Sequence, residues 1–188
     1  PFDVFFSADQ EKPALLEATG QREESEQGIL ATGRFTYAIG ELALWSKSPG
    51  LPVENGELLR QGGFNKLSLA NPRLAPYGVV ALEVLAALGL EESTRERWVQ
   101  GENVTQAFQF VDSGNAELGF VALSQVMQDG EIADGSVWLV PSELHRPIRQ
   151  DAVLLKRGLN NQAAIEFMDF VKSDKARLII QSYGYRFE

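Results

Sequence analysis

Hydrophobic and polar positions follow two patterns that alternate along this chain. Short apolar runs predict strands, and longer runs with apolar residues three and four positions apart predict helices. The predicted strands are residues 2–6, 34–45, 66–70, 97–99, 117–122, 136–140 and 150–155. The predicted helices follow Ser7–Asp9, run from Pro76 to a cap at Gly89, and cover 104–113, 123–127, 161–173 and 175–181. Strands that alternate with helices indicate an α/β fold with parallel sheets built from βαβ units.

Two regions depart from this alternation. Residues 46–63 are rich in Gly, Pro and polar side chains, which predicts a surface loop. The strand predicted at 34–45 has Gly40 in its middle, and its length suits a strand that crosses between two lobes. The chain begins PFDVFFSADQ, directly with an apolar strand pattern, so we expect a further segment upstream of these residues.

Composition narrows the classes of partner. The 188 residues are 44% apolar, enough for a core in one large or two small domains. A net charge of −9 argues against nucleic acid or an anionic membrane surface as partner, but not against a small buried anion. The absence of cysteine excludes disulfides and thiolate metal sites. The sequence has no apolar run of about 18 residues, so we expect no membrane span.

The first candidate binding element is the start of the helix in NPRLAPYGVVALEVLAALGL. Pro76 fits the first helical position, where its missing N–H costs nothing. No acidic cap precedes it, so we expect the amides of Tyr77 and Gly78 to point off the helix end. These two amides are candidate donors to an anion.

A second candidate lies in the segment ENVTQ. Asn103 can cap a helix there, which leaves the amides of Val104 and Thr105 as donors. Successive helices of a parallel sheet begin at the same sheet edge, so both helix starts can face one oxyanion. The same strand–turn–helix junctions also occur in α/β proteins without any anion site, and spacing alone does not separate the two interpretations.

Several segments resemble the periplasmic molybdate-binding proteins of ABC importers, within the type II solute-binding family. They are DVFFSADQ, RFTYAIGELALWS, ANPRLAPYGVVALEVLAALGL, ENVTQAFQFVDSGNAELGFVALSQV and the final SYGY. The resemblance implies a two-lobed fold whose cleft holds a molybdate or tungstate dianion by neutral donors. It implies the amides of Tyr77 and Val104 as ligands, with Gly78, Asn103, Thr105 and Ser7 as weaker candidates.

The resemblance also implies a domain division. Lobe 1 would comprise 1–38 and 150–188, lobe 2 would comprise 39–149, and the hinge crossings would lie near 36–42 and 146–152. The family's usual lobe 1 ligands come from loops upstream of DVFFSAD, which are absent from this sequence. Some members use a tyrosine hydroxyl where this chain has Ala122.

The function implied is high-affinity capture of the oxyanion in the periplasm and delivery to an import permease. The expected protein is a monomer and not an enzyme, needs no cofactor, binds no nucleic acid and does not insert directly into a membrane. Two alternatives remain open: binding of another tetrahedral oxyanion, sulfate or phosphate, or a ligand-sensing domain of a transcriptional regulator. An enzyme is disfavoured because one histidine supplies no nucleophile–base pair.

Other conspicuous residues have ordinary structural interpretations. His145 is expected at the surface or near a hinge crossing, and Tyr183 and Tyr185 are expected to pack in the C-terminal segment. Ser7 and Asp9 are typical of a helix cap, although the loop after a strand can also line a cleft. The acidic run is expected in a solvated loop, and it comprises Glu23, Glu24 and Glu26. The tryptophans are expected to be packing residues, at Trp45, Trp98 and Trp138.

Overall fold

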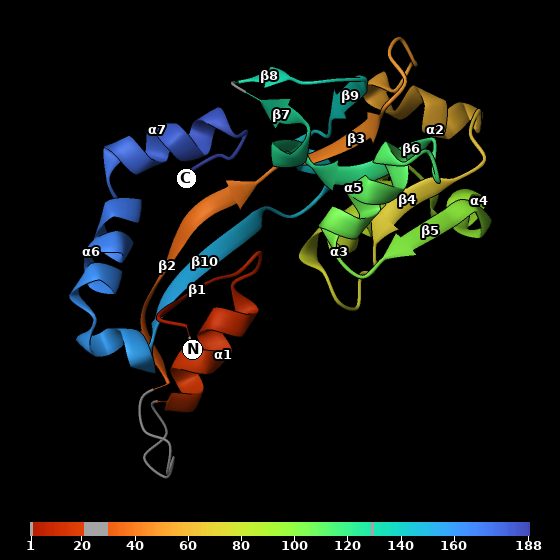
Figure 1. The fold of residues 1–188 in the computed structure, drawn as a ribbon. Coiled ribbons are helices and arrows are strands. Elements are labelled where there is room, and N and C mark those ends of the chain that lie inside the picture. The colour runs from red at the N-terminus through yellow and green to blue at the C-terminus, as the bar shows by residue number, and fades with distance from the viewer. Residues whose placement is uncertain (1, 21–29, 129) are drawn as a thin grey trace. The chain divides into compact units, whose positions relative to one another are not determined.

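The computed structural model describes residues 2–20, 30–128 and 130–188 (Figure 1). The acidic run Glu23, Glu24 and Glu26 lies outside the described residues. Contacts divide the chain into two compact units. Unit 1 is Pro1–Ile39 with Arg149–Glu188, and unit 2 is Gly40–Ile148. The predicted hinge crossings stay a prediction.

Unit 2 is built on a five-stranded sheet with the order β5-β4-β6-β3-β9. The strands are β3 (Leu42–Ser46), β4 (Leu67–Ala70), β5 (Trp98–Gly101), β6 (Leu118–Ala122) and β9 (Ser136–Leu139). Strand β4 pairs in parallel with β5 and β6, whereas β3 pairs antiparallel with β6 and β9. The α/β class is confirmed, but the expected mostly parallel sheet is wrong for this unit. Only the strands joined by crossover helices are parallel, because such a crossover returns the chain in the same direction.

Two helices cover opposite faces of this sheet, α3 (Pro76–Ala87) and α5 (Val104–Asp112). Side chains along a strand alternate between faces. Leu42 and Leu44 of β3 share a buried cluster with residues of α3, whereas Ala43 and Trp45 share a second cluster with Val111 of α5. Each face of the sheet therefore has its own apolar layer and its own helix.

The predicted loop at 46–63 contains helical structure, so that prediction is wrong. A short 3₁₀ turn, η1 (Glu54–Gly56), leads into α2 (Glu57–Gln61). Leu58 and Leu59 of α2 are buried in the core, and this packing overrides the Gly- and Pro-rich composition. The remaining elements of unit 2 are short: α4 (Glu91–Thr94), η2 (Arg95–Arg97), η3 (Leu123–Gln125), β7 (Met127–Gln128), β8 (Glu131–Ile132) and η4 (Ser142–Leu144).

Unit 1 has a three-stranded sheet with the order β1-β10-β2. Its strands are β1 (Val4–Phe6), β2 (Ala31–Gly40) and β10 (Ile148–Leu155), and β1 pairs antiparallel with β10. The strand predicted at 34–45 is therefore two strands, β2 and β3, interrupted at Glu41.

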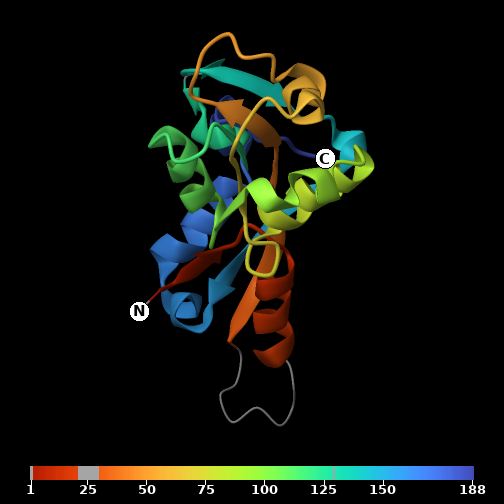
Figure 2. The same cartoon turned by 90° about the vertical axis from the view of Figure 1, so that its right-hand side faces the viewer.

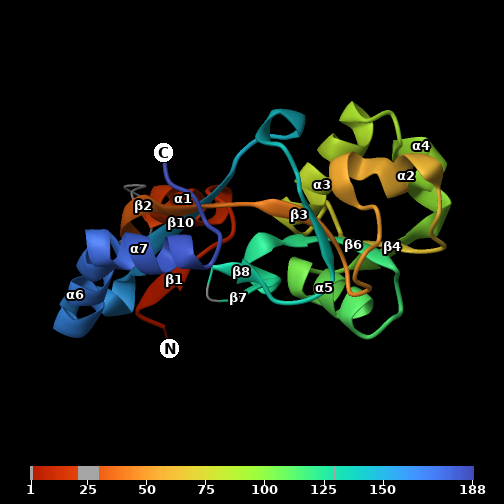
Figure 3. The same cartoon turned by 90° about the horizontal axis from the view of Figure 1, so that it is seen from above.

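Helices lie on both sides of the unit 1 sheet. Helices α6 (Gln162–Val171) and α7 (Asp174–Ser182), preceded by η5 (Lys156–Asn160), lie on one side, and α1 (Glu11–Gly20) lies on the other (Figures 1 and 3). Figure 2 shows α1 running beside β2, to which it is tied by a hydrogen bond from Arg34 to Glu17. Near the C-terminus, Arg186 and Ile39 exchange backbone hydrogen bonds of 2.8 and 2.9 Å.

Candidate functional site

The candidate site lies at the carboxyl ends of β4 and β5 in unit 2. These two parallel strands are neighbours, with Ala70 opposite Gly101 at their ends, and the Asn71 amide donates to the Gly101 carbonyl at 2.7 Å. From β4 the chain continues into α3 on one face of the sheet, and from β5 it continues into α5 on the other. Both connections begin at the carboxyl edge of the parallel strands, where ligands of open α/β sheets usually bind.

The start of α3 has no side-chain cap. Ala75 is the N-cap residue with extended backbone, and Pro76 takes the first helical position. Tyr77 is the next residue and is 4% exposed. Its amide lies in the first turn, where amide groups point outward, beyond the end of the helix. The Gly78 amide donates to the Ala75 carbonyl at 3.0 Å. The expectation that the Gly78 amide points off the helix end is therefore wrong, because this amide closes the first turn onto the N-cap residue.

Gly78 instead permits close packing. A Cβ atom at this position would lie 2.2 Å from the Ala70 carbonyl oxygen and 2.8 Å from the carbonyl carbon of Asn71. Both neighbours are backbone atoms at the end of β4, so they cannot move aside cheaply. Glycine is needed here for helix α3 to begin directly against its strand. The sequence motif Ala-Pro-Tyr-Gly signalled the site, but not this reason for its glycine.

The start of α5 is capped by side chains on both sides of its first turn. Asn103 Oδ1 accepts the Gln106 amide at 2.9 Å, and Gln106 Oε1 accepts the Glu102 amide at 2.6 Å. The predicted cap at Asn103 is confirmed, and its side-chain oxygen is engaged in it. The amides of Val104 and Thr105, the first two of the helix, have no acceptor within their own helix.

The electrostatics at both helix starts favour an anion. Each helix N-terminus carries the equivalent of about half a positive charge, with N–H groups aimed outward. Neither α3 nor α5 has an acidic residue in its first turn. Because the donors are backbone groups, they carry no proton that a change of pH would remove. The arrangement can hold a small oxyanion but supplies neither a nucleophile nor a general base.

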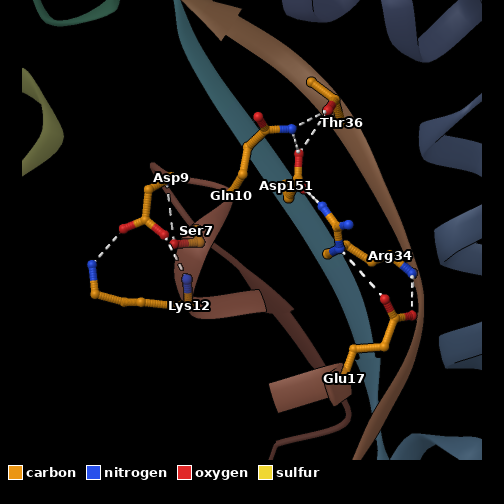
Figure 4. Close-up of polar contacts among 8 residues, drawn as sticks. All are labelled: Ser7, Asp9, Gln10, Lys12, Glu17, Arg34, Thr36 and Asp151. Atoms are coloured by element: carbon orange, nitrogen blue, oxygen red, sulfur yellow. Dashed lines mark hydrogen bonds and ion pairs between the residues drawn. The ribbon is translucent and has the colours of Figure 1, made fainter. Parts of the chain in front are cut away.

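Ser7 lies in unit 1, within the turn that joins β1 to α1. Its hydroxyl oxygen accepts the Asp9 amide at 3.3 Å, and Asp9 Oδ1 accepts the Lys12 amide at 2.9 Å (Figure 4). Burial alone would raise the pKa of Asp9, but its bonds with Lys12 and Ser7 outweigh burial and hold the pKa below its usual value. Both residues therefore act as the turn and cap that the sequence predicts, and a ligand role for Ser7 stays a prediction.

The same part of unit 1 contains a buried carboxylate that sequence reasoning missed. The Asp151 side chain is 0% exposed and accepts hydrogen bonds from Arg34 at 2.5 Å, Thr36 at 2.7 Å and Gln10 at 3.1 Å (Figure 4). Asp151 was predicted only as part of a strand, and its partners are far away in sequence. It joins β10, β2 and the start of α1 in one polar network.

The remaining predicted residues have structural surroundings. His145 is half-buried with Nδ1 2.6 Å from the Arg146 carbonyl oxygen, and Tyr183 is mostly exposed, so packing at that tyrosine is not observed. Trp45 is buried and stacks on Phe108 at 5.0 Å, as expected of a packing residue.

Within the described ranges, no three His, Asp or Glu side chains are grouped to hold a metal ion. Across the same ranges, every helix is too short or too polar to cross a bilayer.

Comparison with known proteins identifies the family. A family model described as bacterial extracellular solute-binding protein matches residues 1–186. The molybdate-binding protein ModA of Azotobacter vinelandii is 50% identical over 185 residues, 98% of this chain and 71% of that protein. ModA of Rhodobacter capsulatus is 42% identical over 187 residues, 98% of this chain and 69% of that protein.

A solved structure supports the same assignment. The periplasmic molybdate-binding protein of Azotobacter vinelandii superposes with a TM-score of 0.90 at 40% identity, covering 100% of this chain and 79% of that chain. These matches confirm the resemblance that the sequence motifs indicated. The chain belongs to the family of bacterial extracellular solute-binding proteins.

Proposed function

We propose that this protein captures molybdate or tungstate outside the cytoplasmic membrane, in the periplasm, and delivers the anion to an ABC-type import permease. The observation that carries the proposal is the pair of helix starts at the carboxyl ends of β4 and β5, with Tyr77 and Val104 in their first turns. The relatives named as molybdate-binding proteins support the choice of anion.

The proposed binding is by neutral donors. The amides of Tyr77 and Val104 each donate to one oxygen of the tetrahedral dianion, with Thr105 as an additional donor. Two helix N-termini then act on the same charge, each through its dipole. Hydrogen bonds to a charged group contribute about 1.5–3 kcal/mol each. Fixed amides also set the size of the anion, so sulfate and phosphate bind less well. The proposed function needs no cofactor and no chemical step.

Removal of a single amide tests the proposal. Val104 is at the first position of α5, where proline is tolerated, and the extended backbone of Asn103 is compatible with a following proline. The substitution Val104→Pro therefore deletes the amide while the helix remains. Loss of one charge-assisted bond of 1.5–3 kcal/mol weakens molybdate binding by roughly 10- to 150-fold.

The matched control is Val104→Ala, which removes the same side chain and keeps the amide. Calorimetric titration of both variants with molybdate, and of the unchanged chain with sulfate and phosphate as competitors, gives the measurement. We expect near-native affinity for Val104→Ala and a large loss for Val104→Pro. Equal affinities for the two variants would remove Val104 from the site. Displacement of molybdate by equimolar sulfate would contradict the assigned ligand.

A further inference from the structure

The strand that leads into α3 also holds α5, through one buried side chain. Leu67 and Leu69 of β4 belong to the apolar cluster on the α3 face of the sheet, so Ser68 between them faces α5. Ser68 is 0% exposed, and its hydroxyl donates to the Ala107 carbonyl oxygen of α5 at 2.9 Å. The two helices of the candidate site are therefore joined through β4, by its chain to α3 and by this bond to α5.

The bond from Ser68 lies in the turn of α5 that presents the candidate donors. The Ala107 amide donates to the Asn103 carbonyl at 3.1 Å, which closes the first turn of the helix. Val104 and Thr105 lie between these two residues, and their amides point outward from that turn. Because one carbonyl of the turn is held from β4, this bond sets the position of both amides relative to β4.

Apolar packing alone does not fix the position of α5 along the sheet. A Cβ atom at Gly101 would lie 2.8 Å from the Ala107 amide nitrogen, and one at Gly119 would lie 2.5 Å from Val111 Cγ2. Helix α5 therefore lies directly against the strands and cannot come closer. Contacts of this kind limit approach but have little direction, whereas a hydrogen bond weakens steeply when its angle changes. The Ser68 hydroxyl supplies a directional contact between the sheet and the start of α5.

We propose that Ser68, which gives no donor to the anion itself, is a positioning residue that sets which size of tetrahedral oxyanion the site prefers. The inference rests on the proposed function. The donors are the backbone amides of Tyr77 and Val104, whose spacing can change only when a helix moves. With α5 held by Ser68, the spacing suits the larger anion, molybdate or tungstate. Without this bond α5 can shift, and the disadvantage of the smaller sulfate decreases.

Deletion of the hydroxyl tests this inference. The bond can bias the position of α5 by no more than its own net contribution, so we expect Ser68→Ala to weaken molybdate binding about two- to tenfold. Sulfate affinity stays the same or rises, so the preference for molybdate over sulfate falls by at least the same factor. The measurement is a separate calorimetric titration with each anion, alongside urea unfolding followed by tryptophan fluorescence.

Two controls separate the position of α5 from general destabilisation. Ser113→Ala removes a bond of the same kind, from the Ser113 hydroxyl to the Gln109 carbonyl at 2.6 Å. Both partners of that bond lie at the carboxyl end of α5 and do not tie it to the sheet, so we expect both affinities to stay unchanged. Ser68→Thr keeps the hydroxyl and Ser68→Val has the same shape without it, so this pair compares the bond at equal volume. We expect the preference for molybdate to be higher in Ser68→Thr than in Ser68→Val.

The outcomes distinguish this inference from the proposed function. If the unchanged chain binds molybdate and Ser68→Ala keeps the full preference over sulfate, the role of Ser68 is overturned and the proposed function stands. The same holds if Ser68→Ala lowers only the urea midpoint. If the unchanged chain binds no molybdate, the proposed function is overturned, and the inference with it.

Discussion

Each of the two units of this protein is stabilised internally by a different kind of interaction. Unit 2 buries leucines, valines, Phe120 and two tryptophans on both faces of its sheet, and all residues of the two buried apolar clusters belong to it. Unit 1 buries mostly small apolar side chains and a fully buried carboxylate, Asp151. Large apolar side chains such as Phe2, Leu178 and Tyr183 remain exposed there.

This difference explains where the candidate site can be rigid. Both first-turn amides, those of Tyr77 and Val104, lie on helices that pack against the core of unit 2. A rigid scaffold holds donors in place without further loss of entropy when the anion binds. Unit 1 depends more on directional polar bonds, such as those that Asp151 accepts.

The largest expected effect is in unit 1. Asp151→Ala leaves Arg34, Thr36 and Gln10 without their common acceptor, and removal of one partner of a buried ion pair costs about 3–5 kcal/mol. Arg34 is partly exposed, so we expect the lower end of that range. All three tryptophans lie in unit 2, at positions 45, 98 and 138. Tryptophan fluorescence therefore follows unit 2 alone, whereas far-UV circular dichroism follows both units.

In urea, Asp151→Ala should shift the dichroism transition to lower concentration and leave the fluorescence transition in place. The control is Glu17→Ala, which removes only the two longer contacts of 3.4 Å that Glu17 accepts from the Arg34 amide and Nε. If both transitions moved together, the two units would unfold as one and the comparison between them would fail.

The second effect is confined to unit 2. Gly78→Ala places a Cβ atom 2.2 Å from a backbone oxygen, and overpacking of this kind costs about 1–3 kcal/mol. The matched control is Gly63→Ala, whose Cβ meets only the end of the Leu58 side chain. We expect the fluorescence transition to move for Gly78→Ala and to stay for Gly63→Ala. Full stability of Gly78→Ala would show that α3 can shift away from β4.

The third effect separates stability from binding at α5. Asn103→Ala removes the cap on the Gln106 amide and costs about 1 kcal/mol of stability. Asn103→Asp keeps an acceptor oxygen and restores stability, but it adds a negative charge at the helix start. If an anion binds there, repulsion of about 1 kcal/mol lowers molybdate affinity by roughly fivefold. Unchanged affinity of Asn103→Asp would place the anion elsewhere.

The smallest effect concerns a pair on the surface of unit 2. Glu83 on α3 accepts the Arg146 amide at 2.9 Å and pairs with the Arg146 guanidinium. Burial alone would raise the pKa of Glu83, but the bonds from Arg146 outweigh it and hold the pKa below its usual value. The pair is largely solvated, so Glu83→Gln costs at most about 1 kcal/mol.

The pH dependence of this pair has a definite sign. Because the folded-state pKa of Glu83 is lowered, its charge contributes its full stabilisation at pH values above the ordinary glutamate pKa of 4.5. That contribution is lost as the pH falls through the folded-state pKa. Thermal midpoints of Glu83→Gln and the unchanged chain should therefore differ at neutral pH and converge in acid. A constant difference between them would mean that the Glu83 charge contributes nothing.

The sequence by itself determined the local elements of this protein. The period of apolar residues located most of the strands and helices, although it missed α2 and joined β2 to β3. Pro76 and Asn103 marked two helix starts, because caps and first-turn residues act on their own neighbours. The motif around Tyr77 also indicated the family.

Only the tertiary structure decided the features that depend on residues far apart in the sequence. They include the antiparallel pairing of β3, the helix at α2 and the network around Asp151. The structure also placed α3 and α5 on opposite faces of the sheet, with both helix starts at the carboxyl ends of β4 and β5. The role of Gly78 could likewise not be predicted from the sequence, because the atom that a Cβ would meet is the carbonyl oxygen of Ala70 in the preceding strand. Local pattern fixes what most segments become, whereas pairing and packing fix which segments meet and, at α2, the structure of the segment itself.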